Sequence, residues 1–278
     1  MALGETARQR RADGAHRDVN RAAWQGGERT AVGEHHCLHG AVVAQHGDEN
    51  LGAPRRSGRS IGDGGALAAL PRGAIHISMS TISPALSRRL SERHRASGQT
   101  YVAAPVFGRP EAAEAKKLWV VAAGPAPAIE RCRPLFDAMG QGTIVAGEEP
   151  ARSNVIKLAG NFLIAAAIEA MGEAFAFGRK HGIAPAELLD VVNGKLFRSP
   201  IYENYGKLIA DERYEPAGFK LKYGLKDVRL TLAAAEEVAA PMPVASVIRD
   251  HYLSGVARGW QDIDWAALAR IASADAGL

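Results

Sequence analysis

From residue 74 onward, apolar runs of strand length alternate with segments of helix length, and this alternation is the feature that most limits the fold. The runs typical of strands cover residues 74–79, 101–106, 118–123 and 143–146. After the first run, Ser83 and Pro84 place an N-cap residue before a proline at the first helical position, which predicts a helix there. A further helix is expected over about 126–138. Strands that alternate with helices indicate an α/β layer with a largely parallel sheet.

The pattern changes after Pro150. Residues 152–181 form one long Ala-rich helical run that ends at Gly182. Shorter helical patterns follow at about 185–194, 200–210, 218–239, 242–258 and 264–273. No strand pattern is convincing in this half, so the sequence predicts an α/β layer over residues 62–149 and an all-helical domain over residues 150–278.

The composition of residues 1–60 differs from that of the rest of the chain. This stretch contains no Lys, Ile, Phe or Tyr, but it holds nine Arg and five of the nine His. Short apolar pieces such as 41–44 occur, yet none resembles a long buried strand. A segment so poor in large apolar residues would hardly offset the entropy lost on ordering. We therefore expect residues 1–61 to be an aberrant, poorly packed segment, and one hypothesis is that residues 1–60 are translated from a shifted frame of GC-rich DNA.

The bulk properties exclude several classes of function. A formal net charge of +4 without a clustered basic patch does not favour nucleic acid or a membrane surface as partner. We find neither a run of about 18 apolar residues nor a secretory signal, and two cysteines set no disulfide framework, so a cytoplasmic protein is expected. The spacing in His35-His36-Cys37 fits no standard zinc site, and no metal is predicted.

Three short stretches could carry chemistry. Residues 78–84 place small hydroxyl side chains at a strand end, where parallel sheets bind ligands, and residues 104–110 place Arg109 just after another strand, where it could pair with a carboxylate. Lys157 and Asn161 are four residues apart, so both project from one face of the long helix. Taken singly, each stretch has an ordinary structural explanation: a helix cap, a surface loop and a solvated lysine.

Other acidic residues of the helical half favour structural roles. Asp262 and Asp264, followed by Trp265, are typical of a helix cap and its packing. Glu169 and Glu173 are interpreted as one solvated helix face.

In order and spacing, the three stretches resemble the β-hydroxyacid dehydrogenase family, which includes 3-hydroxyisobutyrate dehydrogenases and glyoxylate or succinic semialdehyde reductases. The resemblance rests on Ser-x-Ser-Thr-Ile-x-Pro at 78–84, Ala-Pro-Val-x-Gly at 104–108 and Lys-x-x-x-Asn at 157–161. A fourth match is the Lys-Asp pair at 226–227, and the resemblance covers about residues 62–273. The resemblance implies an incomplete Rossmann-like parallel sheet followed by an all-helical domain for substrate binding and dimerisation.

The resemblance also implies roles for individual residues. Lys157 matches the catalytic lysine, which would protonate a carbonyl oxygen as hydride arrives, and Asn161 matches a substrate-binding asparagine. Thr81 and Lys226 match residues that contact the cofactor, NADP or NAD with NADP favoured. Ser80 is expected to help bind a small hydroxy or oxo acid. Family members pair through their helical domains, which implies a homodimer or homotetramer.

Two departures from the family pattern leave alternatives open. The loop that usually reads Val-Ser-Gly-Gly and holds the substrate carboxylate has Phe107 for the serine, then Gly108, then Arg109 for the second glycine. A bulkier carbonyl or an imine therefore becomes an alternative substrate. The glycine-rich Gly-x-Gly-x-x-Gly turn that holds the pyrophosphate is missing, and Asn20-Arg21 is the one trace of a ribose-binding strand end. An inactive remnant of the fold is the other alternative.

Overall fold

The computed structural model describes residues 37–38, 41–44 and 66–278. The chain divides into two compact units, with the boundary between Lys157 and Leu158 inside one long helix. The expectations for the remainder of residues 1–65, including Asn20-Arg21 and the shifted frame, lie outside the described residues.

The first unit contains a mainly parallel sheet of four strands in the order β1-β2-β3-β4. These are β1 (Cys37–Leu38), β2 (Ala41–Ala44), β3 (Ile75–Ser78) and β4 (Thr100–Ala103). Strand β2 pairs in parallel with β3, β3 pairs in parallel with β4, and β1 is antiparallel to β2. Residues 41–44, noted above as a short apolar piece and not as a long buried strand, form a strand of four residues, because such a piece is long enough to extend an existing ladder.

A second sheet of three strands has the order β5-β6-β7. It consists of β5 (Val106–Phe107), β6 (Leu118–Ala122) and β7 (Gly140–Val145), with β5 antiparallel and β7 parallel to β6. The single strand predicted over 101–106 is thus wrong, because the chain leaves the first sheet before Pro105. Proline has no N–H to continue a ladder, and the Pro105 carbonyl instead accepts a hydrogen bond from the Val121 N–H at 2.9 Å.

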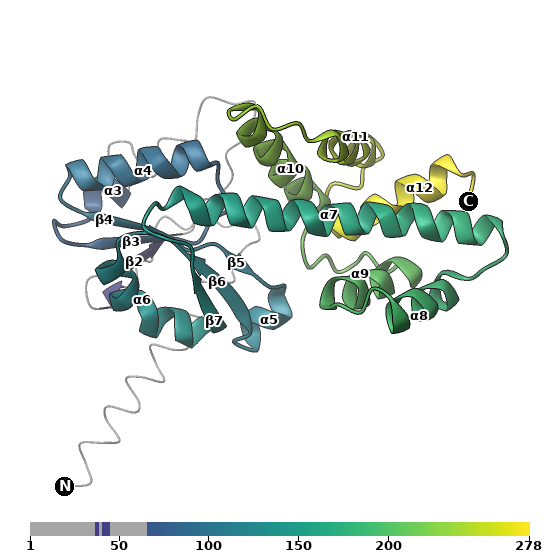
Figure 1. Ribbon diagram of the computed structural model, residues 1–278, viewed down its shortest axis with the longest axis horizontal. Helices are drawn as coiled ribbons and strands as arrows, with labels where there is room; N and C mark the ends of the chain where they lie inside the picture. The colour runs from purple at the N-terminus through teal and green to yellow at the C-terminus, as the bar shows by residue number, and fades with distance from the viewer. Residues whose placement is uncertain (1–36, 39–40, 45–65) are drawn as a thin grey trace, which may run out of the picture. The chain divides into compact units, whose positions relative to one another are not determined.

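In the first unit, helices pack on both faces of the sheet (Figure 1). They are α3 (Ala66–Ala69), α4 (Pro84–Ala96), α5 (Pro110–Glu114) and α6 (Ala126–Met139). Because successive side chains of a strand point to opposite faces, Ile77 and Val102 join the core with α6, whereas Tyr101 and Ala103 join a smaller core with α4. The predicted N-cap is confirmed, since the Ser83 hydroxyl accepts a hydrogen bond from the Leu86 N–H at 3.2 Å.

A buried polar cluster lies between α4 and the sheet. His76 Nδ1 and His94 Nε2 are 2.7 Å apart, and His94 Nδ1 is 2.7 Å from the Gln99 side-chain oxygen. The rings of both histidines also contact the Tyr101 ring. Burial lowers the pKa of His94 below its ordinary value of 6.5, and the hydrogen bond to Gln99 opposes this shift. The neutral form of His94 is therefore the one that the fold accommodates.

Acid is expected to destabilise the first unit through this cluster. Because His94 has a lower pKa folded than unfolded, the unfolded chain binds more protons once the pH falls below about 6.5. The free energy of unfolding should then be constant from pH 8 to 7 and decrease progressively below 6.5. Urea denaturation at a series of pH values measures this. In His94→Gln the decrease between pH 6.5 and 5 should be smaller, whereas in His181→Gln, a change at an exposed histidine, it should not differ. An identical pH dependence in all three proteins would contradict the prediction.

The regular elements of the second unit are helices, and its residues, all of which the structure describes, form no strand beyond a single bridge between Lys220 and Asp264. After α7 (Ala151–Lys180), it contains α8 (Pro185–Lys195), α9 (Pro200–Ala210), α10 (Leu221–Glu236), α11 (Pro243–Ala257), a 3-10 turn η1 (Trp265–Leu268) and α12 (Ala269–Asp275). One core unites these helices, and Ile168, Ile248 and Tyr252 are fully buried in it. Gly182 follows α7 with a φ of +79°, a left-handed conformation that favours glycine at a helix end.

Helix α7 differs from two expectations, which concern its apolar length and the exposure of its acidic residues. By length and composition it is apolar enough to cross a membrane, with a mean hydropathy of 1.5 in one window that is 39% buried. Within the second unit, however, its inward side chains pack as a core helix does. The solvated face expected for Glu169 and Glu173 is wrong for Glu169, which is 7% exposed and lies 2.6 Å from His251 Nδ1. Burial raises the pKa of the Glu169 carboxyl, an effect that His251 counteracts.

Candidate functional site

Polar side chains attach the start of α7 to the strands of the first unit. The Ser153 hydroxyl donates to the Ala103 carbonyl at the end of β4, at 3.2 Å. The Asn154 amide lies 3.4 Å from the Ser80 carbonyl oxygen, just after β3. Both side chains are fully buried. Sequence reasoning did not identify these two residues, although they precede Lys157 by four and three positions and so share its side of the helix.

Lys157 therefore extends from a helix turn that is anchored to two strand ends. Its Nζ lies 4.2 Å from the centre of the Phe107 ring. A cation over an aromatic face is stabilised by about 0.5–2 kcal/mol, depending on how far it is desolvated. The structure thus brings together two of the predicted site residues, and Phe107 holds the ammonium group where a serine would offer a hydroxyl.

The two residues that follow Phe107 are fixed by the first unit itself. Gly108 has a φ of +141°, and a Cβ there would lie 2.5 Å from Leu118 Cδ2. Because L side chains rarely adopt so positive a φ, the backbone conformation favours glycine at this position, where Leu118 packs against it. Arg109 precedes α5, and its Nε lies 4.0 Å from a carboxylate oxygen of Glu111. This separation makes the ion pair weak, and a substrate-binding role for Arg109 stays a prediction.

In the second unit, a buried carboxylate joins two other predicted residues. The Asn161 amide donates to Asp227 Oδ2 at 2.6 Å, and Lys226 Nζ lies 3.1 Å from Asp227 Oδ1. Asp227 is 2% exposed. The bond to Asp227 fixes which way the Asn161 amide is turned, so that its oxygen points away from the carboxylate. Asp227 was part of the Lys-Asp pair but was not predicted as a site residue; its position beside Lys226 was the available signal.

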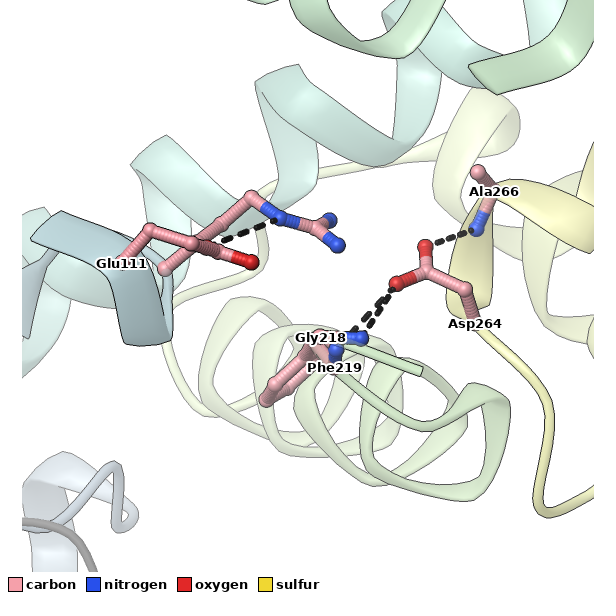
Figure 2. Close-up of polar contacts among 6 residues, drawn as sticks. Glu111, Gly218, Phe219, Asp264 and Ala266 are labelled. Atoms are coloured by element: carbon pink, nitrogen blue, oxygen red, sulfur yellow. Dashed lines mark hydrogen bonds and ion pairs between the residues drawn. The ribbon is translucent and has the colours of Figure 1, made fainter. Parts of the chain in front are cut away.

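Asp264 holds the chain segment that leads into α10, the helix of Lys226 and Asp227. Figure 2 shows its two carboxylate oxygens accepting from backbone N–H groups on both sides. Oδ2 accepts from Gly218 at 2.9 Å and from Phe219 at 3.2 Å, and Oδ1 accepts from Ala266 at 3.0 Å. The expected cap at Asp264 is confirmed, since the side chain caps η1. The bonds to Gly218 and Phe219 are additional to this cap, and they hold the segment that precedes the first residue of α10.

Ser80 and Thr81 follow β3, a strand with parallel neighbours on both sides. The carboxyl end of such a strand is where parallel sheets bind ligands, and both residues are half-buried there. The segment after β2, which would carry a glycine-rich turn, lies outside the described residues, and the sequence contains no Gly-x-Gly-x-x-Gly. The residues that the structure describes fit a group bound at the end of β3, and they include no phosphate-binding turn of the usual kind.

Comparison with known proteins decides the family. Residues 55–147 match the NAD-binding domain of 6-phosphogluconate dehydrogenase, and residues 151–272 match the NAD-binding domain of NADP-dependent 3-hydroxyisobutyrate dehydrogenase. An uncharacterised oxidoreductase of Bacillus subtilis, YfjR, is 43% identical over 76% of this chain and 73% of its own length. The chain belongs to the β-hydroxyacid dehydrogenase family. The predicted family is confirmed, and with it the assignment as an NAD(P)-dependent oxidoreductase.

Other β-hydroxyacid dehydrogenases agree in sequence and in fold. Glyoxylate/succinic semialdehyde reductase 1 of Arabidopsis thaliana is 30% identical over 74% of this chain and 70% of its own. The crystal structure of 3-hydroxyisobutyrate dehydrogenase from Salmonella typhimurium superimposes with a TM-score of 0.68 at 25% identity, covering 74% of this chain and 72% of that one. The predicted fold class, a Rossmann-like parallel sheet followed by a helical domain, is thereby confirmed.

Proposed function

We propose that this β-hydroxyacid dehydrogenase transfers hydride between NADP or NAD, with NADP favoured, and a small hydroxy or oxo acid of the 3-hydroxyisobutyrate, glyoxylate or semialdehyde type. The observation that carries the proposal is the anchored Lys157, whose ammonium group is held 4.2 Å over the Phe107 ring. Related proteins include a 2-hydroxy-3-oxopropionate reductase of Escherichia coli, 29% identical, and a 3-hydroxyisobutyrate dehydrogenase of Pseudomonas aeruginosa, 32% identical.

The residues would contribute as follows. A nicotinamide cofactor, when bound, would supply hydride chemistry at the substrate's carbonyl carbon. Lys157 donates the proton that the carbonyl oxygen needs, and in the reverse direction its neutral amine accepts the hydroxyl proton. Asn161, held by Asp227, is proposed to orient the substrate, Ser80 to contact it, and Thr81 to contact the cofactor.

A substrate panel tests this function. NADPH-linked and NADH-linked reduction of glyoxylate and succinic semialdehyde, and oxidation of 3-hydroxyisobutyrate, are measured with the 278-residue chain. They are repeated with a chimera whose residues 1–61 are replaced by the amino-terminal segment of the Bacillus relative. We expect turnover of at least one oxo acid by the chimera, with NADPH preferred. Absence of turnover from a folded chimera that binds NADPH would refute the proposal.

A second candidate function follows from Phe107. Its apolar ring lies beside Lys157 where the family usually has a serine, so the hydroxyl that would bind a substrate carboxylate is replaced, and this favours a cyclic imine or a less polar, bulkier carbonyl compound over glyoxylate. The same panel with a cyclic imine separates the two. Turnover of the imine without turnover of glyoxylate supports the second candidate, and in that case Phe107→Ser should shift the preference back toward glyoxylate.

We also infer that the chain self-associates through α7. Leu163 and Phe177 are 65% and 69% exposed, and they lie fourteen residues apart, which places them on one side of the helix. Leu163→Glu is expected to lower the mass measured by light scattering from that of a dimer or tetramer to that of a monomer. Val238→Glu, at a site 71% exposed beyond α10, is the control and should not change the mass. A monomeric parent chain would contradict the inference.

A further inference from the structure

A cavity in the second unit combines three arginines with three aromatic side chains. It has a volume of about 270 Å³, and its lining includes Arg179, Arg258, Arg270, Tyr214, Trp260 and Glu212. Neither Asn161, Lys226 nor Asp227 belongs to the lining, so the site described above does not account for it.

The base of this cavity is a tightly packed contact between two helices. A Cβ at Gly172 of α7 would lie 2.6 Å from the Ala269 Cα of α12, so glycine is what allows the two backbones to approach. Phe175 and Tyr214, both buried, complete the floor. Because α12 is held so closely, Arg270, the next residue after Ala269, projects from a fixed point.

Arg270 is held by aromatic rings. Its guanidinium carbon lies 4.3 Å from the centre of the Trp260 ring and 5.8 Å from that of Tyr214. Among the residues that the structure describes, no carboxylate lies within 4.0 Å of its nitrogens. A guanidinium stacked in this way keeps its in-plane N–H donors available, in a planar arrangement that matches carboxylate and phosphate oxygens.

The other two arginines form only loose ion pairs. Arg179 lies 3.4 Å from a Glu212 oxygen, and Arg258 lies 3.7 Å from an Asp275 oxygen. Charge-assisted hydrogen bonds are usually about 2.7–2.9 Å long, and both carboxylates are more than half exposed. Exposed pairs of this kind contribute little, so an incoming anion could displace them at small cost.

We propose that this cavity is a binding site for a small, multiply charged oxyanion, which Arg270 contacts together with Arg179 or Arg258. Three guanidinium groups around one cavity favour more than one negative charge. Drug-sized ligands usually occupy about 300–1,000 Å³, so a cavity of about 270 Å³ suits a phosphate or a small polycarboxylate and not a dinucleotide. The site is independent of the proposed oxidoreductase function.

Calorimetric titration of the 278-residue chain with inorganic phosphate, and separately with citrate, tests the proposal at constant ionic strength. We expect saturable binding of at least one probe, and the tighter probe identifies the class of ligand. Arg270→Met retains an apolar side chain against Trp260 but removes the charge, and binding should become roughly tenfold weaker or more. Arg249→Met, on α11 and outside the cavity, should bind as the parent does.

Three outcomes would overturn the site: no saturable heat with either probe, equal affinity in Arg270→Met, or an equal loss in Arg249→Met. Circular dichroism establishes that each variant is folded. If Arg270→Met does not fold, Arg179→Met takes its place, with the same tenfold loss expected and unaltered affinity counting against the site.

Discussion

The 278-residue chain is expected to bind NADPH several powers of ten more weakly than a chimera that carries the glycine-rich amino-terminal segment of a relative. In the family, a glycine-rich turn presents backbone N–H groups and a helix N-terminus to the pyrophosphate, and this sequence contains no Gly-x-Gly-x-x-Gly. Charged hydrogen bonds contribute roughly 1.5–3 kcal/mol each. Because about 1.4 kcal/mol corresponds to tenfold in affinity, losing two or three such bonds outweighs what Thr81 and Lys226 could supply.

Fluorescence titration of NADPH with both proteins measures the difference. A second chimera, in which alanines replace the loop glycines, is the matched control and should bind as weakly as the 278-residue chain. A micromolar dissociation constant for the unmodified chain would show that its first 61 residues hold the cofactor in some other way. The substrate panel remains informative in that case, because the unmodified chain would then be active.

Replacing Lys157 with alanine is expected to abolish most of the turnover of whichever form of the protein is active. Proton transfer by a positioned side chain contributes about 100- to 10,000-fold to the rate, and the loss should fall on kcat more than on KM. Loss of the contact with Phe107 should lower the free energy of unfolding by no more than about 0.5–2 kcal/mol, which is the contribution of a cation over an aromatic ring.

Lys180→Ala is the matched control for this prediction. Lys180 lies in the last turn of the same helix, and its side chain is exposed, so its loss should leave kcat within about twofold while removing the same charge. Thermal denaturation of both variants separates a chemical effect from a folding defect. If folded Lys157→Ala keeps more than a tenth of the parent kcat, Lys157 is not the proton donor.

The order of strands and helices could be predicted because it depends on local patterns. The strand at 118–122 and the helices at 126–139, 151–180 and 200–210 all lie within a residue or so of their expected limits. Such segments carry their own periodicity and end signals, such as Gly182 after α7. The split at Pro105 was not predicted, since whether an apolar run stays in one sheet depends on which strand accepts its backbone hydrogen bonds.

Burial of polar groups likewise depended on contacts far apart in the chain. Glu169 was expected to be solvated, yet it is buried against His251, 82 residues away. His76 and His94, 18 residues apart, meet because a strand and the following helix pack face to face. Single positions in a helix pattern carry no information on which partner lies across from them.

For the site, the sequence alone determined the residue types and their spacing, namely Lys157 and Asn161 one helix turn apart and Lys226 beside Asp227. These are properties of a helix repeat and of short motifs, so they can be predicted without knowledge of the fold. Only the tertiary structure decided what each side chain contacts: Phe107 over the Lys157 ammonium, Asp227 on the Asn161 amide, and Ser153 and Asn154 on the strand ends. The physical reason is that hydrogen bonds and cation–ring contacts act over a few ångströms between residues up to 74 positions apart, and only packing of the strands and helices brings such residues within that range.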